Sequence, residues 1–195
     1  MAGALALALG ACPGTARAEQ DDDTSEAHWA PPVLHTTGLF IAMRLTEAAI
    51  WPEPFARTEP DFWWARYEDA FTLPPKFDPS LPAFEWDGDP WTINVLGHAL
   101  LGSELYLRAR QCHFGWAGSL AFTAAGSVAW EYVFEANGVR PSAQDLVWTP
   151  LSGWALGEAR FQAARALNGK RGAAQVLRIV LDPFGEAARA LGSGC

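Results

Sequence analysis

The stretch WTINVLGHALLGSELYLRAR (91–110) opens the part of the chain that decides the fold. It is followed by WAGSLAFTAAGSVAWEYVFEANG (116–138) and RPSAQDLVWTPLSGWALGEARFQAARAL (140–167). In all three stretches apolar residues recur every three or four positions, with short polar motifs at the same spacing. This periodicity is typical of helices that bury at least one face. The three stretches therefore predict the helical centre of the protein.

Helical periodicity continues on both sides of this centre. The outer predicted helices cover residues 33–50, 61–71, 173–181 and 183–191. More than half of the fourteen prolines fall in residues 52–90, so residues 73–90 are expected to run extended across the helices. The predicted fold class is all-α: a compact bundle of about five to seven helices with a proline- and aromatic-rich segment packed on it.

A capping residue followed by proline marks two predicted helix starts. Asp89 and Pro90 match the N-cap and the first position of the helix over 91–110, and Thr149 and Pro150 match those of another helix. Between them the motif PSAQD (141–145) has the form of a capping box. It predicts a separate short helix before the one that begins at Pro150.

Glycines inside the predicted helices indicate close helix contacts. Gly97 and Gly102 flank His98, and Gly153 and Gly157 are four apart on one face. Glycine in a helix costs about 1 kcal/mol relative to alanine, so it is expected where another backbone comes close.

The N-terminus has the features of an export signal. Residues 2–11 are a short apolar run, and Ala16-Arg17-Ala18 forms a cleavage site that would remove residues 1–18. Alternatively, residues 9–12 form a lipobox, which would remove residues 1–11 and leave Cys12 lipidated. The acidic residues 19–32 are then expected to be a tether, and residues 33–195 a single helical domain with a motif core over 86–185.

Export would place the chain in an oxidising compartment. There Cys112 and Cys195 could pair or stay as free thiols, and the sequence leaves both open. The expected location is the periplasmic side of the cell envelope, with Cys12 anchoring the chain to the outer membrane if it is acylated.

The charge and the tryptophan content of the chain indicate which classes of partner to expect. The formal net charge is −8, and residues 1–18 carry one charged side chain, Arg17. No basic patch is visible, so nucleic-acid binding is not expected. The ten tryptophans are typical of surfaces where an apolar region meets water. We therefore expect membrane lipid as a partner, and an envelope protein bound through residues 51–91.

Residues 111–130 contain no Asp, Glu, Lys or Arg. A helix of this length would be about 30 Å long, which is enough to cross a bilayer. From Ser119 onward, polar residues recur at every fourth position: Ser119, Thr123, Ser127, Glu131 and Glu135. Such a stripe favours a central buried helix, and a membrane-embedded bundle is the alternative.

Polar residues from different stretches form one candidate site. His98, Glu131, Glu135 and Asp145 could hold a divalent metal or act as acid and base. In a catalytic role, His98 would be the base and Glu131 the acid, and the metal-ligand candidates are His98, Glu131 and Glu135. The full predicted polar centre adds Asn94, Ser127 and Glu158. No cofactor can be named from these residues.

A structural role explains the same residues and is the preferred interpretation. His98 could bond Asn94 or a hydroxyl group of the helix over 116–136, and Asp145 could serve as a cap. Arginines could pair with Glu131 and Glu135, because buried charges need partners. The candidates for that pairing are Arg108, Arg140 and Arg160.

A series of motifs over residues 86–185 carries a family resemblance. In order they are Asn94-x-x-x-His98, Gly102-Ser103, Tyr106, Ala109-Arg110, Ser127-x-x-Trp130-Glu131-Tyr132, Glu135, Pro141-Ser142-x-x-Asp145, Thr149-Pro150 and Gly153-x-x-x-Gly157-Glu158. Together they resemble a bacterial envelope family, domain of unknown function 3943. The resemblance implies a secreted or lipid-anchored envelope protein without an assigned activity. Ala99 departs from the proline expected after the histidine. At the level of pattern, the chain is also similar to VanZ-like membrane proteins, which implies a helical bundle that handles or senses amphiphiles.

The sequence therefore predicts an exported helical protein of the cell envelope that lies against a membrane. Its polar centre would lock the bundle or bind a small ligand. The alternative is a metal- or acid/base-dependent enzyme acting on a lipid or a cell-wall amphiphile.

Overall fold

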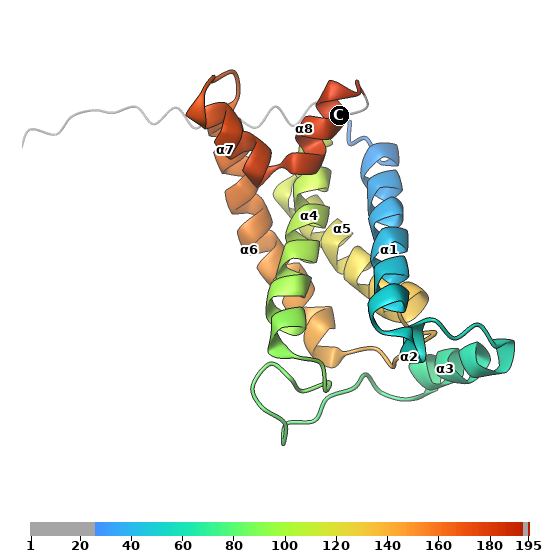
Figure 1. Ribbon diagram of the computed structural model, residues 1–195. Coiled ribbons are helices and arrows are strands. Elements are labelled where there is room, and N and C mark those ends of the chain that lie inside the picture. The colour runs from blue at the N-terminus through green and yellow to red at the C-terminus, as the bar shows by residue number, and fades with distance from the viewer. Residues whose placement is uncertain (1–25, 193–194) are drawn as a thin grey trace, which may run out of the picture.

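The computed structural model describes residues 26–192 and 195, and within this part the regular structure is helical without a strand. The α-helices are α1 (Ala30–Ile50), α2 (Pro52–Phe55), α3 (Pro60–Thr72), α4 (His98–Gln111), α5 (Trp116–Ala129), α6 (Ala143–Leu167), α7 (Ala173–Leu181) and α8 (Pro183–Ala190). Two π-helical segments, η1 (Thr92–Gly97) and η2 (Trp130–Phe134), precede α4 and follow α5. The predicted all-α bundle is confirmed (Figure 1).

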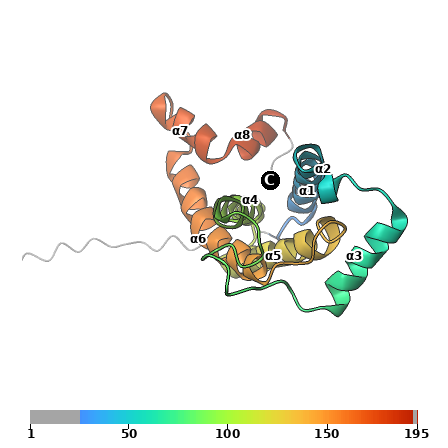
Figure 2. The same cartoon turned by 60° about the horizontal axis from the view of Figure 1, so that its bottom comes forward.

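Helix α4 lies at the centre of the bundle. Figure 2 shows α1, α5 and α6 around it, and Figure 1 shows α7 and α8 at one end and α2 and α3 at the other. The prediction that the helix after residue 115 is the central buried one is therefore wrong. Residues 101–110 of α4 are all buried, including the charged side chains of Glu104, Arg108 and Arg110. Ion pairs allow these charged side chains to be buried. The pattern of hydrophobic residues in the sequence does not reveal those ion pairs.

Glycines bring α4 and α6 into backbone contact. A Cβ atom on Gly102 would lie 2.1 Å from the carbonyl oxygen of Thr149, and one on Gly153 would lie 2.6 Å from the carbonyl carbon of Gly102. A Cβ atom on Gly157 would lie 2.8 Å from Tyr106. The predicted close approach is confirmed at these positions. At Gly97 the nearest atom would be 3.9 Å away, so no close approach requires that glycine.

Helix α6 is continuous, which corrects the prediction of two separate helices. Its capping box is present, because the Ser142 hydroxyl accepts a hydrogen bond of 3.2 Å from the Asp145 N–H. The helix then runs through Pro150 without a break. Proline removes one backbone donor, but the packing of α6 along α4 holds the helix on both sides of it. The Thr149 hydroxyl bonds His98 and does not cap a new helix.

Two other predicted boundaries also differ. Asp89 does not cap the helix that follows, which starts with the π-helical turn η1 and no side-chain cap. The Asp89 N–H instead donates to the Asp87 carboxylate at 3.0 Å. Helix α1 begins at Ala30, so the last residues of the predicted tether 19–32 are helical, with prolines in the first turn where no N–H partner is needed. Residues 19–25, Cys12 and both cleavage sites lie outside the described part.

The segment 73–90 contains no helix, as predicted, but it is extended only around Lys76, because residues 78–88 fold into successive turns. The segment is attached to the start of α6. The Lys76 N–H donates to the Pro141 carbonyl at 2.7 Å, and the Ala143 N–H donates to the Lys76 carbonyl at 3.1 Å. Lys76 and Ser142 thereby form an isolated parallel bridge. This attachment positions the loop residues that reach the polar centre.

None of the helices in the described ranges has the length and apolar character that are needed to cross a bilayer. Helix α5, which covers most of the uncharged stretch, has only fourteen residues, and it buries Ser119, Thr123 and Ser127.

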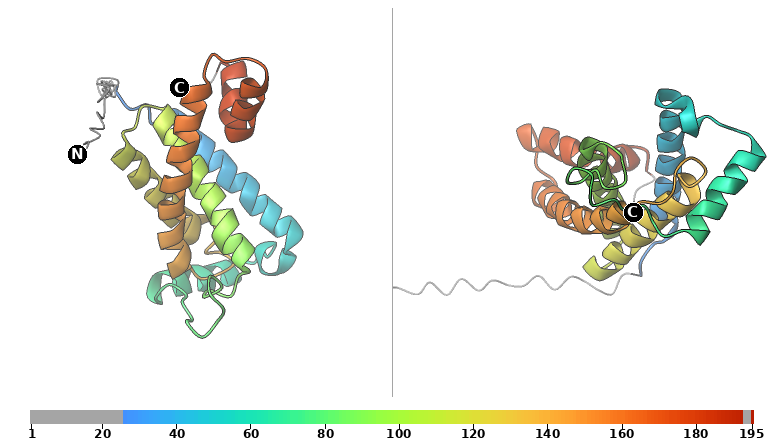
Figure 3. Two further views of the ribbon diagram at one scale, coloured as in Figure 1. Left: turned by 90° about the vertical axis from the view of Figure 1, so that its left-hand side faces the viewer. Right: turned by 90° about the horizontal axis from the view of Figure 1, so that it is seen from below.

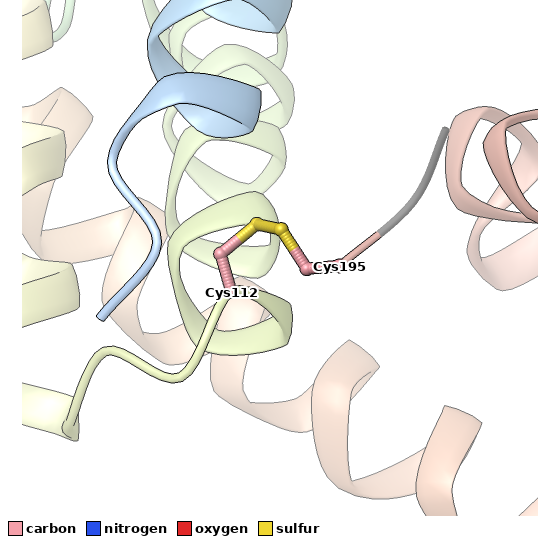
Figure 4. Close-up of a disulfide and its surroundings, with 2 residues drawn as sticks. All are labelled: Cys112 and Cys195. Carbon is pink, nitrogen blue, oxygen red and sulfur yellow. A yellow bond between two sulfur atoms is a disulfide. The ribbon is translucent and has the colours of Figure 1, made fainter. Parts of the chain in front are cut away.

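A disulfide bond joins Cys112, just after α4, to Cys195 (Figure 4). The two cysteines are 83 residues apart in sequence, so the bond closes a loop that contains α5, α6, α7 and α8. Of the two possibilities that the sequence leaves open, the structure has the paired one.

Replacing Cys195 with serine is expected to lower the free energy of unfolding by about 2–4 kcal/mol, because a long loop of the unfolded chain is no longer closed. Denaturant unfolding under non-reducing conditions measures the loss. The double variant Cys112→Ser, Cys195→Ser should lose a similar amount, since both changes remove the same bond. An unchanged unfolding midpoint in Cys195→Ser would contradict the role of the bond.

Candidate functional site

The two π-helical segments meet at a buried polar centre. Segment η1 carries Asn94 and ends just before His98, and η2 carries Glu131. Asp145 joins them from the first turn of α6. π-helical turns are rare in proteins. Where they do occur, they are frequently found at functional sites, because the wider turn redirects side chains. Here both wide turns contribute to the same buried group of residues.

His98 is held between Thr149 and Asp145. Its Nδ1 atom lies 2.9 Å from the Thr149 hydroxyl, and its Nε2 atom lies 3.5 Å from an Asp145 carboxylate oxygen. Burial lowers the pKa of His98 to about 4, although the negative charge of Asp87 opposes this. The imidazole is therefore neutral near pH 7, which is the form that binds metal ions.

Glu131 is buried with one satisfied and one unsatisfied oxygen. Its Oε2 atom accepts a hydrogen bond of 2.7 Å from the Ser142 N–H, and Oε1 has no hydrogen-bond partner. Burial, together with nearby carboxylates, raises the pKa of Glu131 to about 8. Arg108 and Arg160 do not neutralise the Glu131 carboxylate, because both contact Glu104 instead. The predicted pairing of these arginines with Glu131 is therefore wrong.

Asp145 faces the same space as Glu131. Burial, the charge of Glu131 and an interaction with Asp87 raise the pKa of Asp145 to about 9. Its Oδ1 atom has no hydrogen-bond partner. The Ser127 hydroxyl donates to the backbone carbonyl of Asp145 at 3.2 Å, so Ser127 positions the helix start and does not bond the carboxylate.

Two residues of the centre were not predicted. Asp87, from the loop before η1, accepts hydrogen bonds from Asn94 at 2.7 Å and from the Ser142 hydroxyl at 2.6 Å. Thr149 bonds His98, although its position before proline suggested a helix cap. The predicted bond of His98 to Asn94 or to a hydroxyl group of the helix over 116–136 is therefore wrong. The acidic turn WDGDP (86–90) directly before a polar helical stretch was the signal in the sequence that could have indicated Asp87.

Glu135 is not part of the converging ligand group but lies close enough to feel its charges, whereas Glu158 lies apart from this centre. Glu135 follows η2 and is half-buried, and its pKa is raised by burial and by the charges of Glu131 and Glu47. Glu158 is further along α6, where it accepts hydrogen bonds from the Tyr106 hydroxyl at 2.9 Å and from Arg110 at 3.0 Å. The predicted polar set is therefore divided between two places in the bundle.

His98, Glu131 and Asp145 can each offer one ligand atom, and these atoms all lie within 4.8 Å of one another. Two ligand atoms of one tetrahedral zinc ion lie about 3.4 Å apart, because each bond is about 2.0–2.2 Å long. Binding an ion would therefore draw the ligand atoms of this group together by up to about 1.4 Å. Imidazole with two carboxylates suits divalent ions such as Zn²⁺, Fe²⁺ or Mn²⁺. Of the predicted metal ligands, the structure brings together His98 and Glu131, with Asp145 in the place of Glu135.

A family model described as Domain of unknown function (DUF3943) matches residues 83–184. The matched span agrees with the motif core predicted over 86–185, and it contains every residue of the polar centre. No curated protein and no solved structure matches the chain. The weaker similarity to VanZ-like membrane proteins is not shown by these comparisons and stays a prediction.

Proposed function

The chain belongs to the family described as domain of unknown function 3943, and we propose that its polar centre binds one divalent metal ion. The observation that carries this proposal is a pair of buried carboxylates whose free oxygens, Glu131 Oε1 and Asp145 Oδ1, have no hydrogen-bond partner. Both belong to the group that converges with His98. A divalent ion would supply the missing partner of each oxygen.

The neighbours of the three ligands support a metal site. Thr149 orients the His98 ring through Nδ1, which leaves Nε2 directed toward Asp145. Ser142 holds Glu131 through its N–H and Asp87 through its hydroxyl. Hydrogen bonds of this kind, which fix the orientation of metal ligands, are a regular feature of metal sites in proteins.

The burial of the ligands favours a structural ion over a catalytic one. The side chains of His98 and Asp145 are only 10% and 3% exposed. A catalytic metal needs a coordination position that the substrate can reach, whereas a structural metal is enclosed by protein ligands. The ion would join α4, η2 and α6, so its role would be to fix the register of the central helices. The enzyme alternative needs a conformation in which this centre opens.

We further propose that this metal-binding bundle is exported and lies against a membrane in the cell envelope. The disulfide bond supports an oxidising compartment. Exposed apolar side chains support contact with membrane lipid or with an envelope protein. In the segment 51–91 they include Trp51, Trp64, Phe71 and Trp91, which are between 47% and 76% exposed. An anchor at Cys12 remains part of this proposal.

The metal content of the protein tests the central proposal. Protein purified without chelator, or reconstituted with Zn²⁺ and desalted, is expected to hold about one ion per chain, and the added ion should raise the melting temperature. Asp145→Asn and His98→Ala should lose both the bound ion and the response to Zn²⁺. Asp145→Asn keeps the size of the side chain, so it separates loss of a ligand from loss of the fold.

His113→Ala is the matched control, because His113 is an exposed histidine outside the cluster. It should keep the ion and the response of the native protein. Absence of metal from the native protein after reconstitution would overturn the proposal, and so would an unchanged metal content in Asp145→Asn.

A further inference from the structure

Helix α7 turns its apolar residues outward and its charged residue inward. Val176, Ile179 and Val180 are 62%, 44% and 71% exposed. Arg178, the one charged residue of this helix, is half-buried, and its Nε atom lies 2.9 Å from a carboxylate oxygen of Glu186 in α8. A helix on the surface of a bundle in water has the opposite arrangement. The outward side of α7 therefore fits apolar surroundings.

Helix α8 continues this apolar surface. Phe184 is 49% exposed, and Leu191, directly after the helix, is 81% exposed. Val180 of α7 and Phe184 of α8 line the same surface groove, so the exposed residues of the two helices are neighbours. The α7–α8 face consists of the exposed residues Val176, Ile179, Val180, Phe184 and Leu191.

The charges around the α7–α8 face favour an anionic partner. Residues 165–192 contain five basic and two acidic side chains, although the formal net charge of the whole chain is −8. Both acids, Asp182 and Glu186, are ion-paired with arginines. Lys170 and Arg171 directly precede α7, are exposed, and form no ion pair with any residue that the structure describes. Positive charge therefore lies at the edge of an exposed apolar surface.

The opposite end of the bundle has the opposite charge. Residues 52–91 contain nine acidic and three basic side chains. Figure 1 shows α2 and α3, which belong to this segment, at the end of the bundle away from α7 and α8. An anionic surface would attract the end with α7 and α8 and repel the other end. The distribution of charge therefore determines which end would approach such a surface.

We propose that the α7–α8 face docks the protein onto a membrane surface of anionic lipids. Helices that lie in the plane of a membrane interface place their apolar side among the acyl chains and are rich in Lys and Arg beside the headgroups. Val176, Val180 and Phe184 would enter the acyl region, while Lys170 and Arg171 would meet the lipid phosphates. This inference rests on the membrane contact in the proposed function and adds its face and its lipid charge. It leaves the segment 51–91 turned away from the bilayer, toward an envelope protein.

Co-sedimentation with lipid vesicles tests this proposal. The chain without residues 1–18 is used, because it keeps every described helix and lacks both the apolar run 2–11 and Cys12. Vesicles of phosphatidylglycerol and phosphatidylcholine in equal parts should bind it about tenfold or more tightly than phosphatidylcholine alone, since each Lys or Arg near an anionic surface strengthens binding about fivefold. Salt at about 0.5 M should remove most of this difference.

The two vesicle compositions separate this inference from the proposed function. Equal binding to both would overturn the preference for anionic lipid and leave the membrane contact in place. No binding to either kind of vesicle would overturn the membrane contact as well. The metal content of the protein is measured independently of both results.

Variants locate the binding on α7. Lys170→Gln combined with Arg171→Gln should weaken binding to the anionic vesicles about tenfold or more, because two positive charges leave the interface. Val176→Asn combined with Val180→Asn should have an effect of similar size, because two apolar side chains no longer gain from leaving water. All four side chains are exposed, so the melting temperature should not change.

Matched controls lie at the end of the bundle with α3. Arg57→Gln combined with Arg66→Gln changes the net charge by the same amount as the lysine and arginine changes before α7. Trp64→Asn removes an apolar side chain that is 76% exposed. Both controls should leave vesicle binding unchanged, and equal losses at the two ends would overturn the assignment to α7. A lipid-free dimer that Val176→Asn with Val180→Asn dissociates would assign the α7–α8 face to a second copy of the chain instead.

Discussion

Replacement of Gly102 by alanine is expected to lower the free energy of unfolding by about 3 kcal/mol or more, the upper end of the cost of overpacking a core. The new methyl group would lie 2.1 Å from the Thr149 carbonyl oxygen and 3.0 Å from the Gly153 Cα atom. Both neighbours are backbone atoms, so no side chain can rotate away. Helices α4 and α6 would have to separate, and Thr149 would move away from His98.

Gly38→Ala is the matched control for this change. Gly38 also lies inside a helix, α1, but a Cβ atom there meets nothing within 4 Å. The same substitution should therefore stabilise the protein by up to about 1 kcal/mol, because alanine is the better helix former. Denaturant unfolding followed by circular dichroism measures both variants. Equal effects at the two positions would show that the contact between α4 and α6 is not as tight as described.

The second large effect is expected at Glu104, where a single carboxylate pairs with three bases. Its oxygens lie 2.8 Å from Arg108, 2.9 Å from Arg160 and 3.2 Å from His35. Glu104→Gln removes the negative charge and leaves the guanidinium groups of buried Arg108 and half-buried Arg160 with fewer partners. Breaking a buried ion pair costs about 3–5 kcal/mol, and we expect a loss at the lower end because Asp182 still pairs with Arg108.

The effect of Glu104→Gln should also depend on pH. Burial by itself would raise the pKa of Glu104, but the bond with His35 and the charges of Arg108 and Arg160 lower it to about 2. The stability that this carboxylate contributes is therefore complete above about pH 4.5 and is lost as the pH falls toward 2. The difference in unfolding free energy between the native and Glu104→Gln proteins should shrink in the same range.

Glu59→Gln provides the comparison with an exposed pair. Glu59 lies 3.2 Å from Arg57, and its side chain is 60% exposed, so solvent screens the interaction. Its loss should therefore change the stability far less than Glu104→Gln does. If the two substitutions have the same effect at neutral pH, burial does not strengthen the pairing at Glu104.

The helices themselves were largely predictable from local sequence. Apolar periodicity marked α1, α3, α7 and the central helices, and the Ser142 capping box gave the start of α6. These signals are local, because a helix satisfies its backbone hydrogen bonds within itself. The glycines at 102, 153 and 157 also carried information, since glycine is retained inside a helix where a neighbour is close.

Only the tertiary structure decided which helix is central and which polar residues share a site. Glu104 and Arg108 look like surface residues in the sequence, and they are buried because Arg160 and Asp182 come from elements far along the chain. Asp87 reaches the polar centre from a loop held to α6 by the bridge at Lys76. The left panel of Figure 3 shows this loop at the end of the central helices.

The sequence by itself determined an all-helical chain with close glycine contacts and a polar stripe that includes Glu131. It did not determine that Asp145, and not Glu135, would complete the group with His98 and Glu131, or that Pro150 would lie inside a continuous helix. The physical reason is that helix formation depends on neighbours in the chain, whereas the pairing of buried charges depends on distances between helices. Those distances are set by packing, and a single sequence does not contain them.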